Sequence, residues 1–154
     1  QKDKFRTKGA AAVRDAAKSG SKMDIYVADA LRKKGYHVEQ HKQFVIENEK
    51  MHIDIFLPEV NIGIEIDGPT HLRPVYKFGA EAQKDFTAQQ ERDQRKNAQF
   101  IMGGLRIIRL GVERATSIPQ REKYFEMVLK ALDNMKRNSQ DLMYVGDYNP
   151  DQWN

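Results

Sequence analysis

The chain has 154 residues, of which 40% are hydrophobic and 31% charged, a composition typical of a single globular domain that can bury a core. The absence of cysteine excludes disulfides, iron–sulfur clusters, cysteine zinc sites and thiol nucleophiles. No apolar run approaches the roughly 18–20 residues that a transmembrane helix needs.

Positive charge is concentrated at the N-terminal end. Residues 1–22 hold seven basic and two acidic side chains, whereas the whole chain has a net charge of +4. Such a basic arm suits nucleic acid, although a solvated basic helix would have the same composition. We expect residues 1–20 to be a basic helix or a linker from an upstream module of a longer protein.

The hydrophobic pattern predicts an α/β or α+β domain over residues 21–137, with a mixed sheet flanked by helices. Residues 138–154 show no clear pattern and are expected to be a C-terminal tail. The expected elements are a helix from Ser21 to Gly35, strands at Val38–Ile46, His52–Leu57 and Val60–Asp67, a helix at Gln83–Met102, a strand at Leu105–Leu110 and a helix opened by Pro119.

Two neighbouring strands carry acidic residues between apolar ones. Alternation puts Asp54 on the face opposite Ile53 and Ile55, and a turn at residues 59–60 would set Asp54 across from Glu65. Buried carboxylates are costly unless they are paired or bound to a cation, and hard oxygen ligands from two strands favour Mg²⁺. An ordinary strand-end acid is the structural alternative for Asp54.

Three further residues are expected to face the same region. Asp24 lies one turn before the buried stripe of the first helix, His71 follows the third strand in a tight loop, and Asp93 shares a helix face with Phe100. Each has a structural alternative: a helix-dipole acid at Asp24, a loop-capping histidine, and a solvated helix residue at Asp93. Their convergence with Asp54 favours a functional site.

Other polar residues near these strands have structural explanations. Glu65 and Asp67 could pair with Arg106 or Arg109 on the following strand. No partner spacing supports a role for the remaining histidines, which are expected to be structural or solvent-facing: His37, His41 and His52.

Four motifs occur in a fixed order along the chain. They read HIDIF at 52–56, EIDGPTH at 65–71, ERDQR at 91–95 and GLRIIR at 104–109. This ordered set resembles the very-short-patch-repair endonuclease superfamily of the PD-(D/E)XK nuclease fold. Within it, the pattern is most similar to the catalytic domains of phage homing endonucleases that carry a Glu, Asp, His, Asp set. The resemblance covers about residues 23–110 and implies a restriction-endonuclease-like core.

The resemblance implies roles for individual residues. Asp54 would be the central ligand of Mg²⁺ or Mn²⁺, with the backbone carbonyl of Ile66 as a second ligand. His71 would be the general base for the attacking water, and Asp93 would support it. Asp24 or Glu65 would anchor metal-bound water.

Two positions depart from the family pattern. Asp24 stands where the family has a glutamate, and the shorter side chain could misplace a bound water by about an ångström, enough to affect the rate. Asp67 stands where the broader fold often has lysine. Pro69 and Thr70 stand where the mismatch-repair enzymes have an aromatic wedge, so mismatch recognition is not expected.

The implied activity is Mg²⁺-dependent hydrolysis of double-stranded DNA by a homodimer, with no membrane partner and no small-molecule cofactor, in the cytoplasm of a phage-infected bacterium. The residues expected to hold phosphates are basic: Lys18, Lys22, Arg92, Arg95 and Lys96. Two alternatives stay open, namely a catalytically inactive DNA-binding domain of the same fold and an RNA-directed nuclease.

Overall fold

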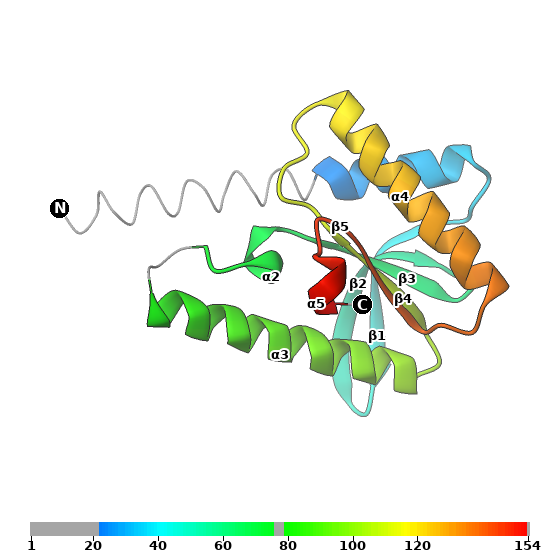
Figure 1. Cartoon of the computed structure of the whole chain (residues 1–154). Helices are drawn as coiled ribbons and strands as arrows, with labels where there is room; N and C mark the ends of the chain where they lie inside the picture. Colours follow the sequence, from blue (N-terminus) through cyan, green and yellow to red (C-terminus); the bar gives the residue numbers. More distant parts are fainter. Residues whose placement is uncertain (1–21, 76–78, 154) are drawn as a thin grey trace.

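The computed structural model describes residues 22–75 and 79–153. Five strands form one mixed sheet in the order β1-β2-β3-β4-β5, and helices cover both of its faces (Figure 1). A helix over residues 22–33 precedes the sheet. The other elements are β1 (Glu39–Ile46), β2 (Glu49–Leu57), β3 (Ile62–Asp67), α2 (Pro69–Leu72), α3 (Ala80–Met102), β4 (Arg106–Gly111), α4 (Ile118–Arg137), β5 (Leu142–Gly146) and α5 (Pro150–Trp153).

The predicted α+β class, with a mixed sheet flanked by helices, is confirmed. β1, β2 and β3 are antiparallel because short turns join them, whereas β3, β4 and β5 are parallel because α3 and α4 carry the chain back across the sheet. The basic helix expected before residue 20 lies outside the described residues. No helix within the described residues is long and apolar enough to cross a membrane.

Two apolar clusters fill the space on either side of the sheet. The helix over residues 22–33 and α4 pack together on one face, where Val27, Leu31 and Leu132 are fully buried. α3 covers the other face and contributes Phe100. Each helix thus buries its apolar stripe against the sheet, which leaves the strand ends free to carry polar side chains.

The turn between β2 and β3 gives the predicted register, with Ile55 opposite Ile64, but the pairing ends there. Asp54 and Glu65 therefore lie just beyond the last bonded pair. The expectation that Ile53 and Ile55 share a face is wrong, because Ile53 packs in the α3 cluster and Ile55 in the cluster on the opposite face. The regular alternation of β2 is interrupted at Asp54, between these two residues.

The described part of the expected tail, residues 138–153, belongs to the domain, because it adds a strand to the sheet. Residues Leu142–Gly146 form β5, which pairs in parallel with β4 at the edge of the sheet. Tyr148 follows it, is 4% exposed, and its hydroxyl donates to the Asp67 carboxylate. The run Leu142–Val145 shows no alternation of apolar and polar residues, because β5 is short and half-buried throughout.

Candidate active site

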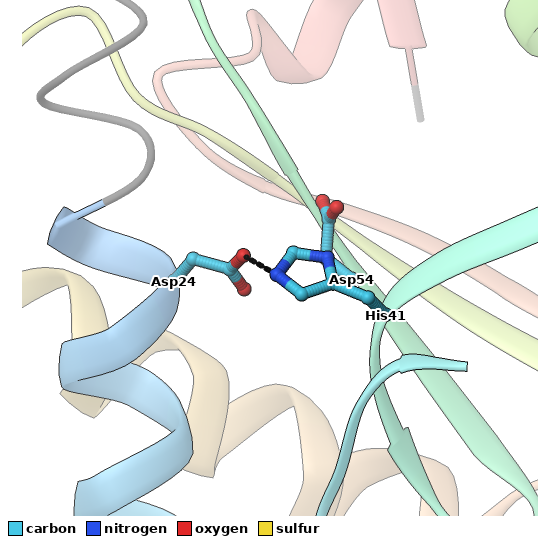
Figure 2. Close-up of side chains that lie close together, drawn as sticks. All are labelled: Asp24, His41 and Asp54. Atoms are coloured by element: carbon cyan, nitrogen blue, oxygen red, sulfur yellow. Dashed lines mark ion pairs between the residues drawn. The ribbon is translucent and has the colours of Figure 1, made fainter.

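Asp24, His41 and Asp54 come together from three different elements, the helix over residues 22–33, β1 and β2 (Figure 2). One donor atom from each lies within 4.8 Å of the other two. His41 Nε2 is 3.4 Å from Asp24 Oδ2. The expected inward orientation of Asp24 is confirmed, because the residue is only 6% exposed. The cluster offers two carboxylates and one imidazole to a single point.

One oxygen of Asp24 has no hydrogen-bond partner among the residues that the structure describes. Oδ1 is buried and accepts no hydrogen bond. Burial raises the pKa of Asp24 to about 7, and the charge of Asp54 adds to this increase while His41 opposes it. A buried carboxylate with an unsatisfied oxygen is costly, so this position would be stabilised by a bound cation.

Asp54 is held at the point where β2 and β3 separate. Its Oδ2 accepts a hydrogen bond of 2.8 Å from the backbone nitrogen of Ile66. The side chain thus satisfies a backbone donor of β3 beyond the end of the β2–β3 pairing. This bond fixes the carboxylate of Asp54 relative to β3 and leaves its Oδ1 available for another ligand.

Glu65 is paired with a lysine from α3. Lys96 Nζ donates to Glu65 Oε1 at 2.8 Å, whereas the structural alternative was a pair with Arg106 or Arg109 of the next strand. Burial raises the pKa of Glu65 to about 8, the charge of Asp54 adds to it, and Lys96 opposes the increase. The resemblance implied only a phosphate contact for Lys96, whereas in the structure its ammonium group is engaged within the protein.

His71 and Asp93 form a hydrogen-bonded pair beside the end of β3. His71 lies in α2, and its Nδ1 is 2.7 Å from Asp93 Oδ2. Burial lowers the pKa of His71, but the hydrogen bond to Asp93 and the charge of Asp67 outweigh it, so the net shift is upward. For Asp93, burial alone would raise the pKa, but the hydrogen bond and charge of His71 and the charge of Arg109 outweigh it, so the net shift of the pKa is downward. An ionised Asp93 accepts a hydrogen bond from the Nδ1–H of a neutral His71, which leaves Nε2 without a proton.

A buried arginine lies beside Asp93 of this pair and donates to the neighbouring Asp67. Arg109 is 1% exposed, and its Nη1 donates to both oxygens of Asp67 at 3.1 and 2.9 Å. Its Nε donates to Asn97 at 2.6 Å, and its Nη1 lies 3.8 Å from Asp93 Oδ1. The alternative that Asp67 pairs with an arginine of the following strand is thus the observed arrangement. Arg109 thus connects β4 to β3 through Asp67 and to α3 through Asn97.

Basic side chains of α3 line a shallow groove together with the start of β2. Arg92 and Arg95 are exposed on α3, and Lys50 of β2 faces them across the groove. Glu49 adds one negative charge and is bonded by Gln99. Lys22 is exposed at the start of its helix, while Lys18 lies outside the described residues.

The predicted site residues fall into two groups around the end of β3. Asp24 and Asp54 are together on one side, and Glu65 is close enough that the charge of Asp54 raises the pKa of Glu65. His71 and Asp93 are together next to Asp67, the last residue of β3. The residue that sequence reasoning missed is His41, which was expected to be structural or solvent-facing. His41 reaches the cluster because the β1–β2 register sets it opposite Asp54 and because its backbone has a φ of 51°.

No protein-family model matches the chain, and no curated protein matches its sequence.

Proposed function

We propose that this chain is a metal-dependent endonuclease of the PD-(D/E)XK type that hydrolyses DNA phosphodiester bonds. One observation carries the proposal: two carboxylates that lack a full set of partners lie on one side of the β3 end, and a histidine–aspartate pair lies on the other. The order of the helix over residues 22–33, three antiparallel strands, α3 and a parallel β4 is compatible with the restriction-endonuclease-like core that the motifs imply.

The donor set near Asp54 fits a divalent cation. Asp24 and Asp54 would hold it, with the carbonyl of Ile66 as a further oxygen ligand, and the unsatisfied Oδ1 of Asp24 is a ready donor. Mg²⁺ or Mn²⁺ bound there would supply Lewis-acid stabilisation of charge on the phosphate. Asp54 is oriented for this task by its bond to the Ile66 nitrogen.

His71 would act as the general base. Asp93 occupies its Nδ1, so the proton of the attacking water goes to Nε2 while the water oxygen bonds to phosphorus and the bond from phosphorus to the leaving oxygen breaks. The His71 side chain is 26% exposed, which allows water to reach it. Arg92, Arg95 and Lys50 in the groove beside α3 would hold the phosphate backbone without reading its sequence.

The proposal predicts nicking or linearisation of supercoiled plasmid with Mg²⁺ or Mn²⁺ and none with EDTA. We would compare the chain with an Asp24→Glu variant, which restores the family's glutamate. Faster cleavage by the variant, by about tenfold or more, is expected because the longer side chain brings the carboxylate closer to Asp54. DNA binding without cleavage by either protein would support a catalytically inactive DNA-binding domain. Cleavage of RNA in preference to the plasmid would support an RNA-directed nuclease.

The pH dependence tests the pairing of His71 with Asp93. The base works only when neutral, so the rate should fall as the pH drops below the raised pKa of His71. Asp93→Asn removes the negative charge and the charged hydrogen bond, so the acidic limb of the pH profile of kcat/KM should move to lower pH. The maximum rate should fall by about 10² or more, because asparagine no longer fixes the required tautomer. An acidic limb that stays in place would show that Asp93 does not act on the base.

A further inference from the structure

His41 brings a nitrogen donor to the two carboxylates that the proposed function assigns to the metal. Its Nε2 lies 3.4 Å from Asp24 Oδ2, and the donor atoms of His41, Asp24 and Asp54 lie within 4.8 Å of one another. Two donors that each lie about 2.2 Å from the same ion are about 3.1 Å apart when adjacent and about 4.4 Å apart when opposite. The 3.4 Å between His41 Nε2 and Asp24 Oδ2 falls within this range, so one ion could bind both atoms.

The backbone of β1 takes an unusual conformation at His41. Its φ of 51° lies in the left-handed region that residues other than glycine seldom adopt. β1 and β2 keep the same register on both sides of this point, yet His41 and Asp54, which that register sets face to face, are not a bonded pair. Such a conformation persists where the surrounding structure demands it, and it is frequent at ligand sites. Here it occurs at the residue that faces Asp54.

The ion pair between His41 and Asp24 leaves the carboxylate incompletely satisfied. The Asp24 side chain is 9% exposed and its Oδ1 has no hydrogen-bond partner. The side chain of His41 is 65% exposed, so an ion can reach the cluster from solvent on that side. A cation at the cluster would engage the free oxygen as well as the imidazole, which the ion pair alone does not.

We propose that His41, Asp24 and Asp54 form a mixed nitrogen–oxygen site that prefers a first-row transition metal ion to Mg²⁺. Imidazole is a good ligand for such ions, whereas Mg²⁺ takes oxygen ligands almost exclusively. The inference rests on the proposed metal-dependent function and names the ion class of the same site. Mn²⁺ is the most demanding probe of this preference, because it is the weakest binder of its series.

The test compares direct binding of Mn²⁺ and Mg²⁺, with Mn²⁺ followed by electron paramagnetic resonance and Mg²⁺ by competition. His41→Asn is the informative variant, because asparagine tolerates a left-handed backbone and offers an oxygen in place of the nitrogen. We expect it to weaken Mn²⁺ binding at least about tenfold and Mg²⁺ binding by less than about threefold. His37→Asn, at an exposed histidine outside the cluster, should bind both ions like the parent chain. Thermal unfolding of both variants controls for folding.

Three results would overturn the inference: unchanged Mn²⁺ affinity in His41→Asn, an equal loss for both ions, or no Mn²⁺ binding by the parent chain. An equal loss would mean that His41 only positions Asp24. Plasmid cleavage, measured on the same preparations, separates this inference from the proposed function. If Mn²⁺ binding depends on His41 but no nucleic acid is cut, the metal site stands and the nuclease function fails. If Mg²⁺-dependent cleavage survives in His41→Asn and Mn²⁺ binding is unchanged, the nuclease function stands and the ligand role of His41 fails.

Discussion

Replacing His71 by alanine should lower the rate of plasmid cleavage by about 10²–10⁴-fold while DNA affinity stays within about twofold of the parent chain. The reason is geometric. Asp93 holds Nδ1 of His71, so Nε2 is the atom left to accept a proton, and no other histidine contacts Asp93 within the described residues. The basic groove that we propose to bind phosphates lies on α3 and the start of β2 and does not include His71.

Single-turnover cleavage and a DNA-binding titration at several salt concentrations measure the two quantities separately. His37→Ala is the matched control, because His37 is exposed and far along the chain from the motifs. Rate loss with intact binding would support proton transfer by His71. Parallel losses of rate and affinity would instead mean that His71 contacts DNA, and an unchanged rate would remove it from the mechanism.

Much of the fold could be predicted because its elements carry strong local signals. The helix over residues 22–33 ends just before Gly35, which has a φ of 96°, and α3 ends just before Gly103, as expected of glycines that stop helices. The register predicted from the turn between β2 and β3 is confirmed.

Two features could not be predicted from the sequence. β5 is held by pairing with β4 rather than by a pattern of its own, and the interrupted alternation at Asp54 depends on tertiary contacts.

The candidate site was predicted in part for the same reason. Asp24 could be placed because helical spacing sets it on the buried face, and the contact of His71 with Asp93 follows from the motif order that the resemblance supplied. His41 could not be placed, because a left-handed residue within a strand leaves no signal in the sequence. Lys96 could not be paired either, since its contact with Glu65 joins residues from α3 and β3 that only the packing brings together.

The acidic residues around β3 have two different kinds of surroundings. Asp67 and Asp93 are paired within the protein, because Arg109 lies between them and Asp93 also contacts His71. Asp24 and Asp54 have no comparable buried cation within the described residues, and the basic side chain in contact with Asp24 is the exposed imidazole of His41. The desolvation cost of the first group is therefore offset by pairing within the protein, whereas that of the second group would be offset by a bound cation.

Replacing Arg109 by methionine should lower the free energy of unfolding by about 3–5 kcal/mol, the usual cost of leaving a buried ion pair without one partner. The guanidinium group is 1% exposed and donates to Asp67, Asn97 and the backbone oxygen of Asp93. Methionine fills a similar volume but donates nothing. The carboxylate of Asp67 would then keep only the hydroxyl of Tyr148 and the distant imidazole of His71.

Urea unfolding measures this loss, and Arg95→Met provides the control, because Arg95 is exposed on α3 and its replacement should change stability by less than about 0.5 kcal/mol. The double variant Arg109→Met, Asp67→Leu separates charge from packing. Removing both partners of a buried pair is far less costly than removing one, so the double variant should regain part of the lost stability. If instead the loss in the double variant equals the sum of the losses in Arg109→Met and Asp67→Leu measured singly, the pair between Arg109 and Asp67 does not stabilise the domain. The role of Arg109 then lies in its bonds to α3.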